Sequence, residues 1–440
     1  MTQNVTAEIR AAIREGRIAQ AEADIAALLL DVTGSPMADV RINFDKYSLN
    51  SVNGFAQSTA GEAYFFKFHQ EDGEEDGVAE YYNAAVLKEA GYPVEQPLFQ
   101  ENRPGRQVLV YRQMVDPRFS DVCSDIEKGD GQEDFERAIS AQVEADKLFS
   151  GVALKTLQHS ESDAARQQSI FQLFYNRLVD DPRKLSGQTL AGRVEKFYLH
   201  EQVNWPGISA PFQDIWMLPW TINGIDYPLT IKDAFDGCLE KLSPLNHIPG
   251  AVVTAHGDAH NANVWFHNNA ASGHATLSLF DPAFAGREIP ALLAEVKASF
   301  HNIFAHPFWL YEPECASDAF AAEATIANGR IRVETDYALT PLREAFLVSK
   351  ANNFWRPLVG ELDRRGWLAP DWEATVRMAF FACPTLVMKL LCGPGSTHNP
   401  SSSLIGFCQA MRAAGAPTNG EEDMFVRFFD RVGKGSDTQS

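Results

Sequence analysis

The feature of the sequence that most constrains its fold is a polar segment, H-G-D-A-H-N-A-N at residues 256–263, between two short apolar runs. The flanking runs, A-V-V-T-A and V-W-F, are typical of buried strands, and a further apolar run ends at Asp281. Loops at strand ends are where a rigid sheet presents polar side chains for chemistry. Asp258, Asn263 and Asp281 would therefore bring three oxygen ligands together. Such a set suits a Mg²⁺ ion that shares phosphate oxygens with its substrate.

The composition describes an ordinary globular protein and excludes some classes of partner. Hydrophobic residues make up 45% of the 440 residues and aromatic residues 11%, enough for one large core or two lobes. The formal net charge of −20 argues against a nucleic-acid partner. The six cysteines form no C-x-x-C pair, and neither a secretory signal nor a membrane-spanning run is recognisable. We therefore expect a cytoplasmic protein without a membrane partner.

The polar segment and Asp281 resemble the signature of the aminoglycoside phosphotransferase and choline kinase group, small-molecule kinases with a protein-kinase-like fold. That signature is H-G-D-x-H-x-x-N, then an Asp after the next hairpin, then a Gly, which here are residues 256–263, Asp281 and Gly286. The resemblance implies that Asp258 is the catalytic base, which orients a small-molecule hydroxyl and receives its proton. It also implies that Asn263 and Asp281 hold Mg²⁺, and that ATP or GTP donates its terminal phosphate.

The elements predicted near the start of the chain extend this resemblance. Residues 43–111 predict three strands, a helix that ends at Gly91, and two further strands, the order found in the small lobe of protein kinases. We expect an α+β, bilobal, protein-kinase-like fold, with a small antiparallel-sheet lobe before a larger, mainly helical lobe. The expected divisions are a helical N-terminal extension (1–42), a small nucleotide-binding lobe (43–114), a large catalytic and substrate-binding lobe (115–432) and a flexible tail (433–440).

The small lobe contains the residues expected to bind the nucleotide. Lys67 lies on the third predicted strand, from which its ammonium would reach the phosphates, and Glu80 on the following helix would pair with it. Gly54, in a turn predicted at residues 50–54 after a strand at 47–49, would cover the phosphates. Gln113 and Met114 lie in the hinge, where backbone groups would meet the purine base. A lone strand lysine is usually an exposed residue without function, and only its place ahead of a suitable helix favours this role.

Other interpretations use part of the same pattern. His256, Asp258 and His260 alternate as the ligands of a zinc hydrolase do, although that interpretation leaves Asn263 and Lys67 without a role. His256 and His260 otherwise serve as anchors of the loop. Nucleotidyl transfer on the same fold would use similar residues. A catalytically silent module that binds a nucleotide or a partner would not need Lys67, both aspartates and Asn263 together.

The acceptor is not identified by the sequence. Acidic residues crowd positions 121–136, and a cationic acceptor such as an aminoglycoside or an amino alcohol would fit if that segment rims the cleft. A solvated acidic loop explains the same residues equally well. The hairpin predicted within 216–231, with its Asn-Gly turn, has no assigned role. Members of the group often have an Asp in a D-L-A-like run after the signature. Here that run is L-L-A at 292–294, so the supporting acid is absent or supplied elsewhere.

Overall fold

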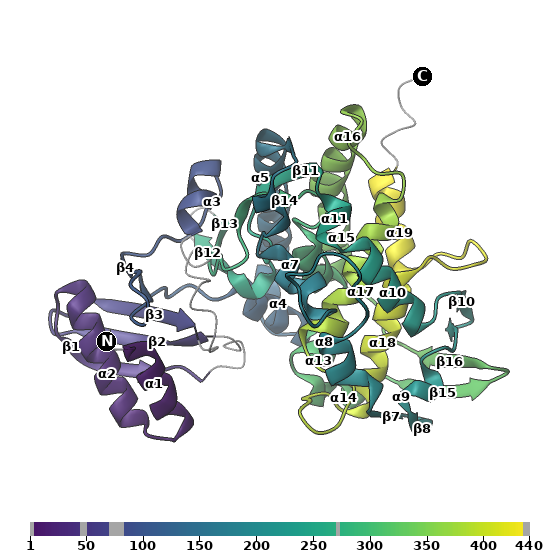
Figure 1. Cartoon of the computed structure of the whole chain (residues 1–440), viewed down its shortest axis with the longest axis horizontal. Helices are drawn as coiled ribbons and strands as arrows, with labels where there is room; N and C mark the ends of the chain where they lie inside the picture. The colour runs from purple at the N-terminus through teal and green to yellow at the C-terminus, as the bar shows by residue number, and fades with distance from the viewer. Residues whose placement is uncertain (1–3, 45–50, 70–82, 270–272, 434–440) are drawn as a thin grey trace.

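The structure, a computed structural model, describes residues 4–44, 51–69, 83–269 and 273–433 and has two lobes. The small lobe combines two helices with a five-stranded sheet, and the large lobe is mainly helical with several small sheets (Figure 1). The expected α+β class, with a small antiparallel-sheet lobe followed by a larger helical lobe, is confirmed. No described helix is long and apolar enough to cross a lipid bilayer.

The small lobe is built on one sheet with the strand order β1-β2-β3-β5-β4, in which every neighbouring pair is antiparallel. Its elements are α1 (Val5–Arg14), α2 (Ile18–Thr33), β1 (Met37–Ile42), β2 (Ser51–Ser58), β3 (Ala63–His69), β4 (Phe99–Glu101) and β5 (Val108–Arg112). Successive side chains of a strand point to opposite faces of the sheet. Tyr64, Phe66 and Phe68 pack against α1 and α2 in one apolar core, so Phe65 and Lys67 project from the other face.

Two features of the small lobe differ from the prediction. Residues 37–42, expected in a helical extension, form the edge strand β1, because their apolar side chains complete the core that α1 and α2 cover. Residues 51–54, expected in a turn, lie inside β2. A Cβ on Gly54 would lie 2.1 Å from the Arg41 O and 2.6 Å from the Phe66 ring, so strand packing requires glycine there. The strand predicted at 47–49 lies outside the described residues.

The helix that follows β3 in sequence belongs to the core of the large lobe. This helix, α3 (Ala84–Ala90), ends at Gly91 in the left-handed conformation, as predicted. Its apolar side packs with large-lobe residues. The next residues pair with strand β13 (His274–Leu279), where the Leu279 N–H donates to the Pro93 O at 2.7 Å. This pairing joins the segment after α3 to β13 two residues before Asp281.

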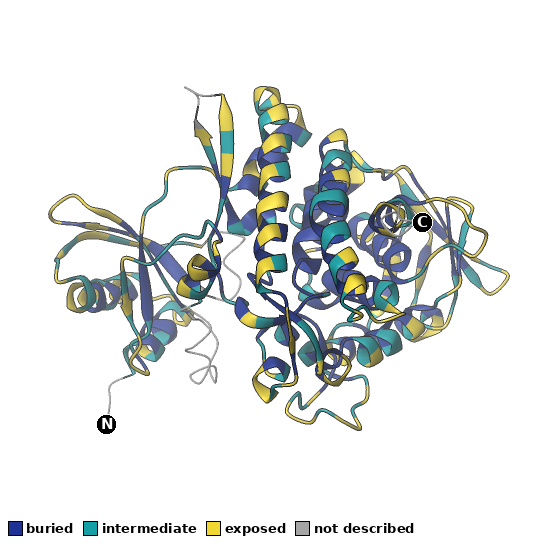
Figure 2. Ribbon diagram, turned by 90° about the horizontal axis from the view of Figure 1, so that it is seen from above, coloured by how far each residue is buried: buried dark blue, intermediate teal, exposed yellow. Residues whose placement is uncertain are grey.

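The large lobe is a stack of helices with short sheets at its edges. The long helices are α4 (Phe119–Lys128), α5 (Phe135–Thr156), α10 (Ile231–Lys241), α15 (Pro341–Ser349), α16 (Arg356–Arg364), α17 (Trp372–Val387), α18 (Pro400–Ala414) and α19 (Met424–Gly433). The short helices are α6 (Asp163–Arg166), α7 (Ile170–Leu173), α8 (Gly192–Val194), α9 (Phe212–Ile215), α11 (Pro244–His247), α12 (Val296–Ser299), α13 (Pro307–Leu310) and α14 (Ala316–Ala319). Figure 2 shows that the sides of the long helices that face the lobe interior are buried.

The strands of the large lobe form four small sheets among the described residues. The sheet that bears the polar loop contains β6 (Gln158–Ser160), β11 (Gly250–Ala255) and β14 (Gly286–Pro290), and β12 (Val264–Asn269) pairs with β13. The remaining strands are β7 (Gln202–Trp205), β8 (Ile208–Pro211), β9 (Trp220–Ile222), β10 (Ile225–Tyr227), β15 (Ala322–Ala327) and β16 (Arg330–Thr335). The hairpin predicted around Asn223 and Gly224 is confirmed as β9–β10, and its pairing with β16 was not predicted.

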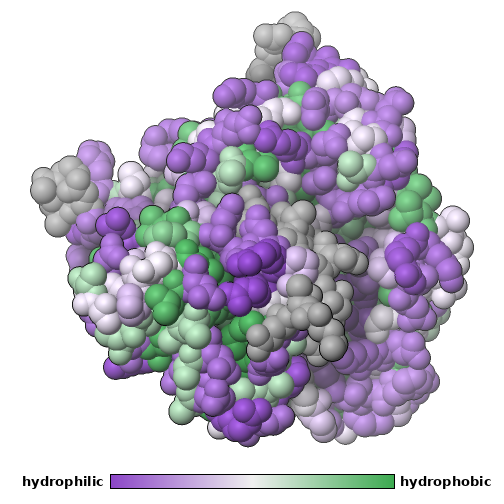
Figure 3. All heavy atoms as spheres, turned by 60° about the vertical axis from the view of Figure 1, so that its left-hand side comes forward, coloured by the Kyte–Doolittle hydropathy of each residue, from purple (hydrophilic) through white to green (hydrophobic). Residues whose placement is uncertain are grey.

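The helical stretch expected at 164–179 is broken into α6, α7 and a further short turn. Gln168, in the break between α6 and α7, lies against Gly286 at the start of β14. A Cβ on Gly286 would lie 2.0 Å from the Gln168 Oε1. The molecular surface seen from the small-lobe side is mostly hydrophilic, with limited apolar areas (Figure 3).

Candidate active site

The polar loop joins the end of β11 to the start of β12, as the sequence predicts. Gly257 turns the backbone with a φ of +77°, a conformation that costs other residues free energy. A Cβ at this position would also lie 2.7 Å from the Phe284 O, a backbone atom that cannot rotate away. Glycine is therefore required here both by conformation and by space.

His256 anchors the loop to the end of β13. Its Nε2 lies 2.9 Å from the Phe280 O, and its Nδ1 accepts a hydrogen bond from the Asp258 N–H at 3.3 Å. Because Nδ1 accepts, the proton of the neutral ring sits on Nε2 and is donated to the carbonyl. Burial lowers the pKa of His256 below its ordinary value, which keeps the ring neutral. His256 thus holds Asp258 beside the residue that precedes Asp281.

Asp258 presents a carboxylate oxygen that no described residue satisfies. Its side chain is 14% exposed, and its Oδ1 is buried without a hydrogen-bond donor among the described residues. The His260 Nε2 lies 3.6 Å away and the Lys297 Nζ 3.7 Å away, both beyond ordinary hydrogen-bond distance. A buried polar atom without a partner costs free energy, and this oxygen is therefore able to accept a hydrogen bond from a bound molecule.

Asn263 and Asp281 meet at the same sheet edge. The Asn263 Nδ2 donates to the Asp258 O at 2.9 Å, which leaves the amide oxygen for another partner. The Phe280 N–H donates to the Asn263 O at 3.0 Å and holds the end of β13 beside the loop. Asp281 adopts the left-handed conformation, with a φ of +54°. One carboxylate and one amide oxygen fit a Mg²⁺ ion that takes its other ligands from phosphate and water.

Lys67 reaches this point from the small lobe. Its Nζ forms an ion pair and hydrogen bond with the Asp281 Oδ1. Burial raises the pKa of Asp281, but the charge and the hydrogen bond of Lys67 outweigh it and hold the pKa below its ordinary value. Asp281 is therefore ionised at neutral pH. Glu80, the expected partner of Lys67, lies outside the described residues.

The face of the sheet that bears Lys67 is aromatic, which was not predicted. Phe65 lies between Phe55 and Tyr111, with ring centroids 5.7 Å and 6.4 Å away. The three are directly opposite one another on β2, β3 and β5. Phe65 is two residues from Lys67, so strand alternation places both on one face. That alternation was visible in the sequence, but the pairing of β2, β3 and β5 that aligns the rings was not.

The other predicted nucleotide residues lie as follows. Gln113 extends the β5–β3 ladder, because its N–H donates to the Ala63 O at 3.0 Å. Met114 is half-buried and begins the segment that leads to α4 in the large lobe. Gly54 lies in the interior of β2 rather than at a hairpin turn. The structure therefore does not place Gly54 in the turn from which it was expected to cover the phosphates.

Further supports of the loop come from the helical segment after β14. The Asn302 Oδ1 accepts a hydrogen bond from the Asn261 N–H at 2.9 Å. The L-L-A run at 292–294 lacks the Asp that the kinase group resembled by the signature often has in a D-L-A-like run. Glu295 follows the run directly, and its carboxylate pairs with the Lys350 Nζ at 3.0 Å. Asp146 pairs with the same ammonium at 2.5 Å, and all three side chains are buried. An acid for anchoring this segment is thus supplied by the next residue.

The zinc-hydrolase interpretation finds no support in the arrangement. His256 uses both ring nitrogens within the protein. The His260 Nδ1 accepts from the Ala262 N–H at 3.3 Å, and burial lowers the pKa of His260 to about 4. The described residues contain no group of three or more His, Cys, Asp or Glu that could hold a metal ion.

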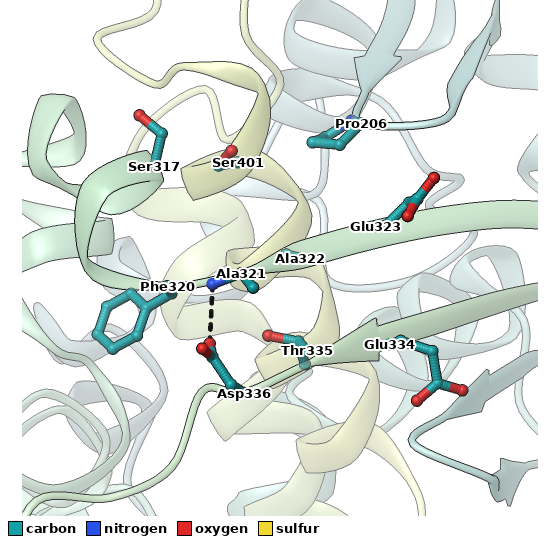
Figure 4. Close-up of a pocket in the computed structure, with 10 residues that line it drawn as sticks. All are labelled: Pro206, Ser317, Phe320, Ala321, Ala322, Glu323, Glu334, Thr335, Asp336 and Ser401. Atoms are coloured by element: carbon teal, nitrogen blue, oxygen red, sulfur yellow. Dashed lines mark hydrogen bonds between the residues drawn. The ribbon is translucent and has the colours of Figure 1, made fainter.

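A cavity of about 620 Å³ lies elsewhere in the large lobe, between β15, β16 and the start of α18 (Figure 4). Its lining includes Phe320, Glu323, Glu334 and Asp336, and the Asp336 carboxylate accepts a hydrogen bond from the Ala321 N–H at 2.8 Å. It contains none of the residues described above, so it is separate from the loop site.

Comparison with solved structures finds small-molecule kinases. A spectinomycin phosphotransferase in complex with ADP and spectinomycin is 11% identical, with a TM-score of 0.36, and the match covers 88% of this chain and 98% of that one. An amicoumacin kinase in complex with AMP-PNP and Ca²⁺ is 12% identical, with a TM-score of 0.40 and coverages of 88% and 91%. A fructosamine-3-kinase from Thermobifida fusca, itself designated putative, is 14% identical, with a TM-score of 0.34 and coverages of 89% and 98%.

No family model and no curated protein matches the chain. The structural neighbours belong to the aminoglycoside phosphotransferase and choline kinase-like group, which is the group that the signature around Asp258 resembles.

Proposed function

We propose that the protein is a magnesium-dependent phosphotransferase that moves the terminal phosphate of ATP or GTP to a hydroxyl of a small molecule. The observation that supports this most is the contact between Lys67 and Asp281, because it joins the lobes beside Asp258 and Asn263. Phosphoryl transfer needs the phosphates held, their charge neutralised and the acceptor aligned, and these four groups match those needs.

In the proposed reaction, Asp258 accepts the proton of the acceptor hydroxyl on its unsatisfied Oδ1. The acceptor oxygen forms a bond to the terminal phosphorus, and the bond from that phosphorus to the bridging oxygen breaks, so the nucleoside diphosphate leaves. Asn263 and Asp281 would hold Mg²⁺, which would supply charge neutralisation at the phosphate oxygens. Lys67 turns its ammonium from Asp281 towards the same phosphates.

The nucleotide base is assigned to the aromatic face of the small-lobe sheet. Phe55 is 40% exposed and Phe65 is partly buried beside it, so the rings offer an apolar surface on the side that bears Lys67. Stacking on such a surface uses the flat face of the base and does not depend on the hydrogen-bonding groups at its edge, which distinguish adenine from guanine. ATP and GTP therefore remain equal candidates for the donor.

The acidic residues of segment 121–136 lie mostly on the surface. Glu127 is the exception, because its side chain is buried in an ion pair with Arg343, with an Nε–Oε1 distance of 2.6 Å. Asp134 forms a partly exposed pair with Arg137 at 2.7 Å. The acceptor is therefore proposed only as a small molecule with a free hydroxyl.

The test is a calorimetric titration of ATP and of GTP into the protein, with Mg²⁺ and with the metal chelated. Magnesium-dependent binding is expected, and binding should weaken when Asp281 is replaced. Absence of binding under every condition would contradict the proposal and direct the search towards protein partners. A screen of hydroxylated compounds then follows the mass of the product. A gain of one phosphate supports the proposal, whereas a gain of a nucleoside monophosphate assigns nucleotidyl transfer instead.

A further inference from the structure

Lys297, on α12, lies against the proposed base although no sequence motif marks it. Its side chain is 4% exposed, and its Nζ lies 3.7 Å from the Asp258 Oδ1. A buried ammonium ion is stable only when an opposite charge or several acceptors compensate it. The Asp258 carboxylate provides that charge, and Lys297 in turn faces the carboxylate oxygen that lacks a donor.

A second contact directs the ammonium. The Lys297 Nζ lies 3.1 Å from the His301 Nε2, four residues along the same helical segment. A lysine ammonium can only donate, so Nε2 accepts and the ring proton sits on Nδ1, which faces the Tyr311 hydroxyl. Burial lowers the pKa of His301 well below its ordinary value, so the ring adds no charge of its own. His301 therefore orients Lys297 without competing for Asp258.

His260 completes the surroundings of the carboxylate. Its ring stacks on His301 with centroids 5.0 Å apart, and its Nε2 lies 3.6 Å from the Asp258 Oδ1. Lys297 and His260 thus approach the same oxygen from two elements. Lys67 is engaged elsewhere, with Asp281. Each of the two aspartates of the site is consequently matched with its own lysine, one from each lobe.

We propose that Lys297 is a positioning residue for Asp258: its buried ammonium balances the carboxylate and holds Oδ1 in the orientation from which it accepts the proton of the acceptor hydroxyl. The inference rests on the proposed phosphotransfer and adds to it a residue from the large lobe. It also explains how a carboxylate can stay buried without a direct hydrogen bond, because an opposite charge lies next to it.

The test compares Lys297→Met, which keeps the length and removes the charge, with Lys297→Arg, which keeps the charge. Lys389→Met is the matched control, because Lys389 is also buried and pairs with a single carboxylate, that of Glu201, at 2.8 Å. Turnover is measured as Mg²⁺-dependent release of phosphate from ATP or GTP to water, and nucleotide affinity by calorimetry. Lys297→Met should lower kcat by about 100-fold, the scale of a lost acid–base contribution, with affinity close to that of the wild type. Lys297→Arg should recover part of the loss, and Lys389→Met should keep the wild-type kcat.

A kcat for Lys297→Met equal to that of the wild type would overturn the inference, as would a loss of turnover that only follows a loss of affinity. A second measurement does not depend on activity. Lys297→Met and Asp258→Asn should each lower Tm, and the double variant should lower it no further than the larger single change, because removing both charges leaves neither one buried alone. Additive shifts would refute the pairing. If the wild type neither binds nor hydrolyses ATP or GTP while the Tm shifts of the single and double variants show coupling, the proposed function fails and the pairing stands.

Discussion

The two lobes each bring a lysine to the candidate site, and they hold it in different ways. Lys67 projects from the aromatic face of the small-lobe sheet with its side chain 13% exposed, and its partner Asp281 is 35% exposed. Lys297 is buried in the large lobe beside Asp258, whose side chain is 14% exposed. The small lobe therefore contributes a cation that depends on how the lobes meet, whereas the large lobe contributes one that is part of its core. Changes at Asp281 should act on nucleotide binding, and changes at Asp258 on turnover.

The largest effect is expected for Asp258→Asn. The amide cannot take the proton of the acceptor, so turnover should fall by at least about 100-fold. Nucleotide affinity should stay near the wild-type value, because the proposed metal ligands Asn263 and Asp281 are unchanged. Steady-state kinetics and calorimetry on the same preparation separate the two quantities. Wild-type turnover by this variant would show that the division of labour between the aspartates is wrong.

Asp281→Ala should have the next largest effect, on binding. The variant removes the proposed carboxylate ligand of Mg²⁺ and the ion pair between Lys67 and Asp281. Magnesium-dependent nucleotide affinity should weaken by about 10-fold to 100-fold, as when the support of a metal ligand is lost. Asp336→Ala is the control, since that carboxylate lies at the remote cavity. Equal affinities for the Asp281 variant with and without Mg²⁺ would agree with the proposal. An unchanged magnesium dependence would contradict it.

Gly257→Ala tests whether the large-lobe loop is held by its backbone. Its matched control is Gly329→Ala in the β15–β16 turn, where φ is +69° and no atom lies within 4 Å of the added Cβ. The control should cost about 1 kcal/mol of unfolding free energy from the left-handed conformation alone. Gly257→Ala adds the clash with the Phe284 O and should cost about 1–3 kcal/mol more, as overpacking does. Urea unfolding measures both, and equal costs would show that the loop can shift.

The smallest effect is expected from mild acidification, which should lower the stability of the large lobe more than that of the small lobe. Burial lowers the pKa of His247, His260, His306 and His398 to about 4, and all four lie in the large lobe. The unfolded chain binds protons at these rings near pH 6.5 and the folded chain does not, so stability should be lost as the pH falls from about 6.5 to about 4.

Tryptophan fluorescence can follow this transition, because every tryptophan of the chain lies at or beyond Trp205. The fluorescence change should therefore report the large lobe. Amide hydrogen exchange in β2, β3 and β5 should follow the small lobe over the same pH range. If protection in the small-lobe sheet is lost at higher pH than the tryptophan signal changes, the large lobe is not the acid-sensitive region.

Much of the site could be predicted from sequence because its residues lie close together along the chain. The loop between β11 and β12 and the strand that delivers Asp281 are local elements, and their apolar runs and polar ends indicate both strands and turns. The Asn223–Gly224 turn was predicted for the same reason, since its left-handed conformations favour those two residues. Lys67 was likewise predicted on a small-lobe strand, since a strand was expected at residues 63–68, which is β3.

Residues that act through distant neighbours were not predicted correctly. Gly54 has the composition of a turn, but its role is to let Phe66 and β1 approach β2 closely. Residues 37–42 end in an alternation of apolar and polar side chains, which is typical of a strand, and the sheet together with α1 and α2 provides the surface for it. The error at Gly54 has a different cause, which is that packing against a partner far away in sequence overrides local preference.

The sequence by itself determined the chemistry that the loop can offer, because the order of aspartate, asparagine and histidine at strand ends is a local property. Only the tertiary structure decided which charges those groups meet. Lys297 is one lysine among many in the sequence, and it acquires its position beside Asp258 when α12 packs against the loop. The aromatic face formed by Phe55, Phe65 and Tyr111 likewise exists only once three strands are in register. The physical reason is that periodicity reports which face a side chain occupies, whereas burial and pairing depend on contacts that folding alone creates.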